Sequence, residues 1–320
     1  MQRLIAALLW ASCLVVGWHN GASAEVWPSR PIRAILPFAP GSGTDVVSRL
    51  VFNQLSIELG QQIVVENRGG AGGTLGTAAV ATADPDGYTI LAHSTSLAIT
   101  PALYPNISYD VTRDFAAVAA FGRMPTVLLV APSKGIKTLQ EFVALAKSKP
   151  LTYASAGVGS TTHMTAERFR LSAGFDAIHV PFRGGGFRPE LASGRIDFAF
   201  SPIAVALPEI RDGRLIALAV SGKERASALP DMPTTLEAGY PNSDYALWLG
   251  IFLPAKTPQA IVERLHQATM KALQTPALRD RLATLDVEPM PMTPAEFGAY
   301  VRDDIVVQGA LAKAAKLKPE

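Results

Sequence analysis

Short runs of apolar, often β-branched residues alternate along this chain with longer segments whose apolar positions recur at helical spacing. The first run, Ile32–Phe38, predicts a buried strand. In the next segment, residues 44–59, the apolar side chains fall on one face of a helix that Gly60 would end. Further strands are predicted at residues 62–66 and 88–92, with a short helix between them. This β-α-β-α-β order indicates a mostly parallel sheet.

The alternation starts again in the second part of the chain. It predicts strands at residues 126–130, 151–155, 178–181, 196–200, 215–220 and 247–253, and helices at 138–148, 161–173, 187–193, 258–274 and 294–315. The pattern therefore predicts two α/β units, a first lobe of residues 25–125 plus 245–320 and a second lobe of residues 126–244. A chain that crosses twice between lobes leaves a cleft, and ligands usually bind in such clefts. A single continuous α/β domain is the simpler alternative.

The first 24 residues have the pattern of a secretory signal peptide. Arg3 provides a short positive start, residues 4–16 are almost entirely apolar, and residues 22–24 (Ala-Ser-Ala) form a cleavage site. The apolar run is too short to span a bilayer core of about 30 Å. A lipid anchor on Cys13 is an alternative, although Trp10 stands where lipoprotein signals carry an aliphatic residue. We therefore predict a secreted protein of the periplasm.

Composition and charge argue against several classes of function. Cys13 is the single cysteine, so a mature chain that starts at Glu25 has no disulfide, no thiolate nucleophile and no cysteine metal site. The formal net charge is +2, and cleavage removes one basic residue, Arg3, and no acidic one. So small an excess of positive charge argues against nucleic acid as a partner. No later stretch has the roughly 18 apolar residues of a membrane span.

Three glycine-rich turns connect predicted strands to predicted helices, at residues 40–45, 155–161 and 183–186. Glycine lets backbone N–H groups approach a ligand closely, and a helix N-terminus offers unpaired N–H donors with partial positive charge. Such turns can bind an anion without a basic side chain. Their serines and threonines could equally act only as helix caps. Because two of the turns lie in different halves of the chain, they could hold both ends of a carboxylate ligand if they face each other.

Motifs that would indicate an enzyme are missing. The chain has no P-loop and no G-x-S-x-G nucleophile elbow, and Gly157-Val158-Gly159 lacks the third glycine of a dinucleotide fingerprint. The histidines show no metal-ligand spacing, and His163 and His179 are expected to be packed structural residues. Asp45 is expected to complement the positive end of its helix, whereas Asp197 could cap a turn or meet a ligand's amine. The sequence predicts no catalytic residue, no metal site and no cofactor.

A series of short motifs runs the length of the mature chain. They are Trp27–Ile32, Pro37–Asp45, Val65–Gly73, Pro85–Tyr88, Tyr153–Gly157, His179–Phe182, Ala228–Thr234 and Pro294–Phe297. In these motifs and in their order, the chain resembles the substrate-binding proteins of tripartite tricarboxylate transporters, the Bug family. The resemblance implies a type II periplasmic-binding-protein fold, in which two α/β lobes are joined by two crossing strands with a ligand cleft between them.

The resemblance also implies a function. Members of the family close on a small carboxylate solute and deliver it to a pair of membrane permease subunits. Backbone amides, hydroxyls and water bind the carboxylate, rather than an arginine. Carried over to this chain, the ligand-binding residues would be Phe38, Ala39, Gly41, Ser42, Gly43, Thr44, Asp45, His93, Ser94, Ser96, Ser155, Gly157, Gly159, Ser160 and Thr161, to which the third turn adds Gly184 and the charged residues add Asp197. A monomer is expected, and dicarboxylates, tricarboxylates, amino acids and aromatic acids all remain open as ligands.

The chain departs from the family pattern at three places. Ser42 stands where glycine is commoner, and the turn at residues 183–188 is one residue shorter than usual. The shorter turn could bring Phe187 or Arg188 into the cleft, although Arg183 and Arg188 by themselves are expected to be solvated. The tryptophan expected in the last helix is also absent.

Two other functions remain open on the sequence. One is a sensor that presents its solute to a signalling receptor instead of a transporter. The other is a periplasmic enzyme on the same fold, which would need a nucleophile–base pair across the cleft, such as Ser160 with His163.

Overall fold

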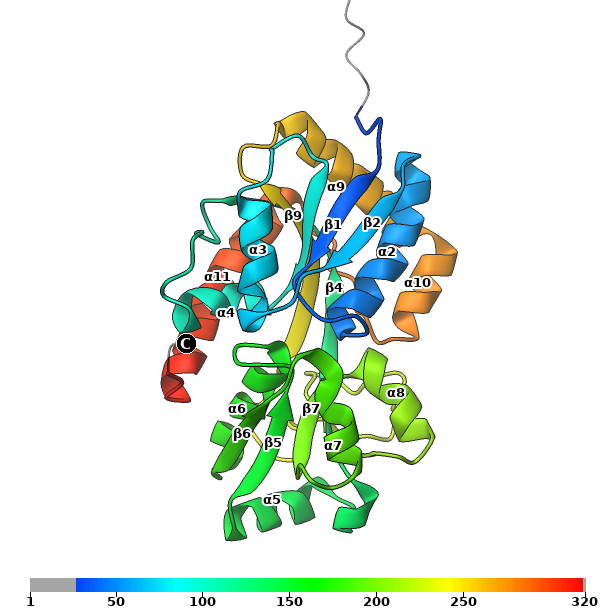
Figure 1. Ribbon diagram of the computed structural model, residues 1–320. Coiled ribbons are helices and arrows are strands. Elements are labelled where there is room, and N and C mark those ends of the chain that lie inside the picture. Colours follow the sequence, from blue (N-terminus) through cyan, green and yellow to red (C-terminus); the bar gives the residue numbers. More distant parts are fainter. Residues whose placement is uncertain (1–26, 319–320) are drawn as a thin grey trace, which may run out of the picture.

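The computed structural model describes residues 27–318, which form two lobes, one above the other in Figure 1. The predicted signal peptide, with the alternative lipid site at Cys13, lies outside the described residues. In the part of the chain that is described, no helix combines the length and the apolar composition needed to cross a bilayer.

The first lobe is built on a sheet with the strand order β2-β1-β3-β9-β4. Strands β1 (Ile32–Leu36), β2 (Ile63–Asn67) and β3 (Thr89–Ser94) are parallel and form the β-α-β-α-β unit predicted from the sequence. Strands β9 (Ala246–Pro254) and β4 (Phe115–Val130) add an antiparallel part from later in the chain. Since parallel strands end at one edge of a sheet, the turns after β1 and β3 meet at the edge facing the second lobe (Figure 1).

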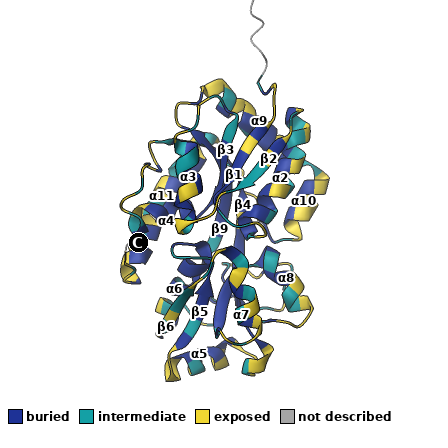
Figure 2. Ribbon diagram, in the orientation of Figure 1, coloured by how far each residue is buried: buried dark blue, intermediate teal, exposed yellow. Residues whose placement is uncertain are grey.

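Helices cover both faces of this sheet (Figure 1). They are α2 (Gly43–Leu59), α3 (Thr74–Ala81), α4 (Ser96–Leu103), α9 (Gln259–Gln274), α10 (Pro276–Ala283) and α11 (Pro294–Ala314). The apolar stripe predicted for the first helix is the buried face of α2, which places Val47, Val51 and Leu55 in a core shared with α9. Phe297 of α11 packs with Trp248 in a second core. Figure 2 shows this division into buried inner and exposed outer helix faces.

The second lobe has its own sheet, made of the last part of β4 with β7 and β8 on either side, followed by β5 and β6. Its strands are β5 (Leu151–Ser155), β6 (Ala177–Pro181), β7 (Phe198–Pro202) and β8 (Ile216–Val220), and its helices are α5 (Leu139–Ser148), α6 (Thr161–Ala173), α7 (Arg188–Ala192) and α8 (Ile203–Arg211). Phe142, Phe169 and Phe198 form the centre of its core, with edge-on and tilted ring contacts.

The two lobes are joined through β4 and the segment that leads into β9. Residues 115–125 of β4 pair with β9, and residues 126–130 pair with β7 and β8. At the crossing, Ser221 Oγ accepts a hydrogen bond from Thr126 N at 2.9 Å and donates one to the carbonyl of Tyr245. The two passages of the chain therefore lie side by side. The lobe boundaries predicted from the sequence fall at this crossing and stay a prediction.

The sequence pattern did not reveal α4, α8, α10 or the first part of β4. Helices α4 and α8 each contain a proline, Pro101 and Pro208, which favours a break when a helix is predicted from sequence. The missed part of β4 is rich in alanine and mostly buried on both faces, so it shows no alternation of apolar and polar residues.

Candidate ligand-binding site

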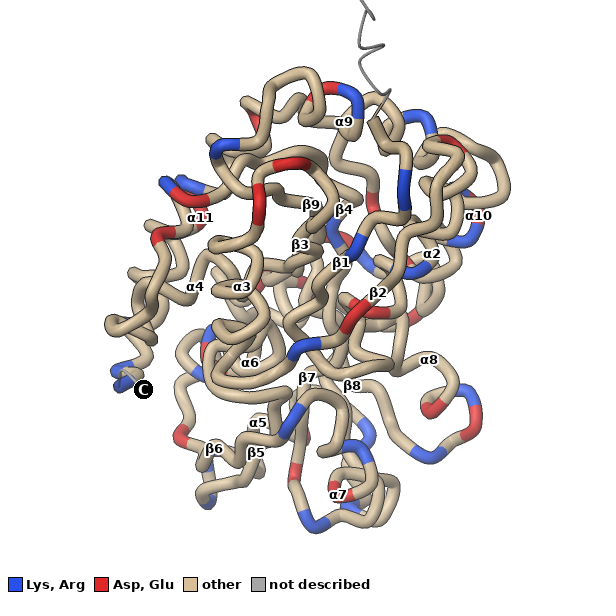
Figure 3. Tube along the Cα trace, turned by 45° about the horizontal axis from the view of Figure 1, so that its top comes forward, with Lys and Arg blue, Asp and Glu red and all other residues tan. Residues whose placement is uncertain are grey.

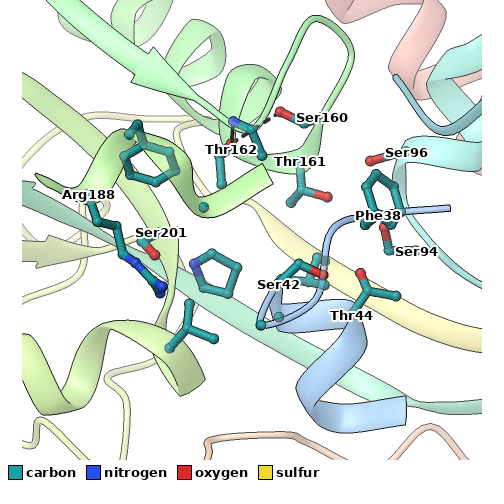
Figure 4. A pocket seen from close by; sticks show the side chains of 18 residues that line it. Phe38, Ser42, Thr44, Ser94, Ser96, Ser160, Thr161, Thr162, Arg188 and Ser201 are labelled. Atoms are coloured by element: carbon teal, nitrogen blue, oxygen red, sulfur yellow. Dashed lines mark hydrogen bonds between the residues drawn. The ribbon is translucent and has the colours of Figure 1, made fainter. Parts of the chain in front are cut away.

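A cavity lies between the two lobes (Figure 4). It holds about 520 Å³ of empty space, part of which is open to solvent. Its walls are formed by Phe38, Gly41, Ser42, Gly43, Thr44, Ser94, Ser96, Ala156, Ser160, Thr161, Thr162, Gly185, Phe187, Arg188, Ser201, Pro202, Val205 and Leu247. Both lobes contribute, so a ligand bound here would touch both.

The turn after β1 presents the N-terminus of α2 to this cavity. Ser42 is the N-cap, and its Oγ accepts a hydrogen bond from Asp45 N at 3.2 Å. Asp45 does not line the cavity. Its carboxylate accepts hydrogen bonds from Gly41 N and from Arg49 Nε, each at 2.9 Å, and from Asn67 Nδ2 at 2.9 Å. Asp45 therefore braces the turn and complements the positive end of α2.

The turn after β5 presents the N-terminus of α6 in the same way. Ser160 is the N-cap, and its Oγ accepts a hydrogen bond from His163 N at 3.3 Å and lies 3.1 Å from Thr162 Oγ1. Gly157 (φ 124°) and Gly159 (φ 71°) supply the positive φ angles that this turn requires.

The two helix N-termini face each other across the cavity. Ser42 and Thr44 lie on one side and Ser160 and Thr161 on the other (Figure 4). Unpaired N–H groups and partial positive charge at both termini favour an anion between them. Among residues 27–318, Arg188 is the only charged side chain that lines the cavity, and no acidic side chain of this part lines it to oppose a negative ligand. Elsewhere acidic and basic residues are interspersed along the chain in both lobes (Figure 3).

Five hydroxyl groups lining the cavity have no protein partner. They belong to Thr44, Ser94, Ser96, Thr161 and Ser201. These residues are at most 7% exposed, and within residues 27–318 none of the five hydroxyls makes a hydrogen bond to the protein. Their hydroxyl oxygens are not fully buried but open to the cavity, where water or a ligand can accept and donate the hydrogen bonds that polar groups need. The five hydroxyls therefore mark a place for a polar ligand, with water in its absence.

The residues predicted to bind ligand divide into two groups. Nine line the cavity: Phe38, Gly41, Ser42, Gly43, Thr44, Ser94, Ser96, Ser160 and Thr161. Eight do not: Ala39, Asp45, His93, Ser155, Gly157, Gly159, Gly184 and Asp197. Several of these eight shape the walls from behind. Gly184, for example, packs against Ala39 across the cleft, where a Cβ at position 184 would lie 2.6 Å from the Ala39 Cβ.

Asp197 lies away from the cavity, and its expected contact with a ligand is wrong. Its carboxylate accepts hydrogen bonds from Lys134 Nζ at 2.6 Å and from the N–H and hydroxyl of Thr152 at 2.8 and 2.9 Å. Asp197 directly precedes β7 and Thr152 is the second residue of β5, so this cluster is at the opposite end of the parallel strands from the cavity. Burial raises the pKa of Asp197, but these hydrogen bonds outweigh it and hold the pKa below its usual value. Of the two roles that the sequence left open for Asp197, the structural one agrees with these contacts and the contact with a ligand does not.

His93 lies behind the cavity wall. Its ring packs edge-on against Phe38, with 5.3 Å between the ring centroids, and Phe38 lines the cavity. The residue is buried, and burial lowers its pKa to about 4. His93 is therefore an uncharged support for Phe38 at neutral pH.

A stack of histidines lies under the second-lobe turn. Ser155 Oγ is 2.7 Å from His179 Nε2, and the rings of His179 and His163 stack with their centroids 3.9 Å apart. His163 Nδ1 accepts a hydrogen bond from Gly159 N at 3.2 Å, so the stack supports the turn. Burial lowers the pKa of His163 to about 3 and that of His179 to about 4. These contacts agree with the structural role expected for both histidines.

We expect the protein to lose stability as the pH falls from about 6.5 toward 4. A histidine of the unfolded chain takes up a proton near pH 6.5, whereas folded His93 and His163 stay neutral down to their pKa values of about 4 and 3. The unfolded state thus binds more protons in this window, and the free energy of unfolding falls by up to about 1.4 kcal/mol per pH unit for each histidine. Urea unfolding at a series of pH values measures the slope. The variant His93→Gln should have a smaller slope, and an unchanged slope would contradict the assignment to His93.

Sequence reasoning missed part of the site. The lining residues that were not among the predicted ligand-binding residues are Ala156, Thr162, Gly185, Ser201, Pro202, Val205 and Leu247, although Ala156 and Gly185 lie within two of the predicted turns. No glycine-rich turn marks the end of β7, and the position of Ser201 near the carboxyl end of a strand was the only available signal. Phe187 and Arg188, which the shortened turn singled out, do line the cavity, whereas Arg183 is exposed.

Two α/β lobes with a cavity between them, lined by hydroxyl groups, two helix N-termini and apolar side chains, define a solute-binding protein of the periplasmic-binding-protein type. A family model described as "Tripartite tricarboxylate transporter family receptor" matches residues 47–317. The chain belongs to this family, which confirms the resemblance that its motifs suggested.

Individual relatives agree with this assignment. Protein BugT of Bordetella pertussis is 34% identical over 310 residues, covering 95% of each chain. The solved structure of R. palustris Rpa4515 with adipate is 30% identical with a TM-score of 0.88, and the match covers 92% of this chain and 100% of that one. MatC (Rpa3494) from Rhodopseudomonas palustris with bound malate is 33% identical with a TM-score of 0.83, covering 89% and 99%. These structures confirm the predicted fold class.

Proposed function

We propose that this protein captures a small carboxylate solute between its lobes and delivers it to the membrane subunits of a tripartite tricarboxylate-type transporter. The observation that carries the proposal is a cavity in which two helix N-termini face each other and five hydroxyl groups make no hydrogen bond to the described residues. Such groups bind a carboxylate as hydrogen-bond donors without needing a counter-charge. Adipate in Rpa4515 and malate in MatC, two carboxylates, support the same ligand class.

The number of donors is sufficient for useful affinity. A hydrogen bond to a charged group contributes about 1.5–3 kcal/mol. A micromolar dissociation constant corresponds to about 8 kcal/mol. Four such bonds reach this value at about 2 kcal/mol each, and at the upper end of the range they leave a margin for the cost of ordering the ligand.

The proposal is for binding without turnover. Ser160 Oγ accepts a hydrogen bond from the backbone of His163, whose ring Nδ1 is engaged by Gly159 N, so this pair has no nucleophile–base geometry. Ser155 and His179 are within hydrogen-bond distance, but Ser155 is fully buried and does not line the cavity. Recovery of a chemically altered solute after incubation with the pure protein would overturn this part of the proposal.

A thermal-shift screen of residues 25–320 against carboxylates and amino acids tests the function. A ligand at about 100 times its dissociation constant should add roughly 2.7 kcal/mol to the free energy of unfolding, which is readily seen as a rise in Tm. Isothermal titration of each hit should give one site per chain. If the ligand-free protein binds no carboxylate in the panel, the proposed ligand class is wrong.

Replacing Thr44 and Thr161 together with valine is expected to weaken carboxylate binding by about 2–4 kcal/mol. The double variant removes one hydroxyl from each side of the cavity and leaves the two N-caps, Ser42 and Ser160, in place. The Tm of the ligand-free protein should therefore change little. Titration with the best ligand of the screen measures the effect, and a loss below about 0.5 kcal/mol would mean that the two hydroxyls do not bind the ligand.

We further propose that the protein works as a monomer in the periplasm, after removal of residues 1–24. Homology to periplasmic binding proteins supports the compartment. Cell fractionation and the N-terminal sequence of the secreted chain test cleavage before Glu25, and light scattering tests the monomer. Crosslinking in native membranes should recover transporter subunits, whereas recovery of a signalling receptor would favour the sensor function instead.

A further inference from the structure

Arg188 is the one cation that the described residues contribute to the cavity wall, and its N–H donors make no hydrogen bond to the protein. It opens α7, directly after the glycine-rich turn at Gly184–Phe187. Its side chain is 29% exposed and, within residues 27–318, donates no hydrogen bond to the protein. A guanidinium has five N–H donors, so those of Arg188 are available to water or to a ligand in the cavity.

The nearest acidic side chain, Glu209, does not accept a hydrogen bond from Arg188. Glu209 Oε1 on α8 is 3.8 Å from Arg188 Nε, well beyond the roughly 2.7–2.9 Å of a hydrogen-bonded arginine–carboxylate pair. The other oxygen, Glu209 Oε2, is buried and has no hydrogen-bond partner among the described residues. The two side chains are thus close enough to attract each other, but they do not satisfy each other.

Arg188 lies on the opposite side of the cavity from several of the hydroxyl groups. Figure 4 shows its side chain across the pocket from Phe38, Ser94 and Ser96. Apolar side chains of the second lobe that line the cavity lie near Arg188. Phe187 is its neighbour in sequence. Val205 is on the same face of α8 as Glu209, the residue next to Arg188. One side of the cavity therefore offers the hydroxyls of Ser94 and Ser96, and the side of Arg188 offers a cation beside apolar surface and the Ser201 hydroxyl.

We propose that Arg188 is a specificity-determining residue that binds the second carboxylate of a solute with acidic groups at both ends. The helix N-termini and hydroxyls would hold the first carboxylate, and the apolar side chains would contact the carbon chain between the two groups. Arg188 turns from Glu209 to the ligand when the cavity is filled. This inference rests on the proposed function and selects dicarboxylates from the ligand classes that the sequence left open.

Paired ligands that differ only in the second carboxylate test the inference. Adipate and hexanoate have the same number of carbon atoms, as do succinate and butyrate. Titration of the wild-type protein should show a preference for the better dicarboxylate over its monocarboxylate partner of roughly 10- to 100-fold. In Arg188→Met this preference should fall to about threefold or less, with little change in monocarboxylate affinity, and Arg188→Lys should retain part of it. Arg183→Met is the matched control, because Arg183 is an exposed cation of the same turn that does not line the cavity.

The outcomes separate this inference from the proposed function. Equal affinity of the wild-type protein for both members of each pair, or the same preference in wild type and Arg188→Met, would overturn the role of Arg188 and leave carboxylate capture standing. A loss of preference in Arg183→Met as well would also overturn it, because the effect would then be one of general charge. Binding only to carboxylates with a single acidic group, and to none of the dicarboxylates in the panel, would refute the dicarboxylate assignment alone. Failure of the whole carboxylate panel would refute the proposed function.

Discussion

Gly43→Ala is expected to weaken ligand binding by roughly 10- to 100-fold without destabilising the ligand-free protein. Gly43 is the first residue of α2 and meets Pro202 of the second lobe across the cavity. A Cβ at this position would lie 2.8 Å from the Pro202 Cβ and 2.9 Å from its Cγ, closer than real side chains approach. Overpacking of this kind costs about 1–3 kcal/mol. Opening the cleft would relieve the clash in the ligand-free protein, so the cost would fall on the ligand-bound, closed state and lower the affinity.

The backbone conformation at Gly43 gives no reason for the variant to lose stability. Its φ angle is not in the left-handed region, and alanine is a better helix former than glycine, so α2 itself should tolerate the change. Titration and thermal unfolding of the ligand-free variant measure the two effects. Gly186→Ala is the matched control, because a Cβ at residue 186 would meet nothing within 4 Å. Undiminished affinity in Gly43→Ala would show that the bound lobes do not approach each other at Gly43 and Pro202.

Phe297→Ala is expected to lower the free energy of unfolding by about 3–5 kcal/mol. The ring is fully buried and packs on Trp248 and Phe252, with centroids 5.5 and 5.2 Å away. It also fills the space above Gly250, where a Cβ would lie 2.5 Å from the Phe297 Cζ. Its removal leaves a cavity between α11 and the first-lobe sheet that the rigid strands cannot close.

Urea unfolding of the ligand-free variant measures this loss. Val306→Ala is the control on the same helix, because Val306 is 72% exposed and its truncation should change stability by no more than about 0.5 kcal/mol. A loss below about 1 kcal/mol for Phe297→Ala would mean that α11 adjusts to fill the space, and that it is less firmly packed than its contacts indicate.

The sequence by itself determined those features that rest on local signals. Apolar spacing located β1, α2, β2 and β3, because a strand or helix buries one face whatever lies opposite. Glycine and capping residues located the turns at residues 40–45 and 155–161, because their backbone angles and N-caps involve only near neighbours. These turns supplied Ser42, Thr44, Ser160 and Thr161, which all line the cavity.

Only the tertiary structure decided which other residues join them. Ser201, Pro202 and Leu247 enter the cavity because strands distant in sequence are brought beside the two turns. Asp197 is removed from consideration because its partners, Lys134 and Thr152, lie 63 and 45 positions away along the chain. Whether Arg188 faces solvent or the cavity depends likewise on how the second lobe packs against the first. A site between two lobes is made of long-range contacts, and local patterns of polarity do not record which distant segment will lie opposite.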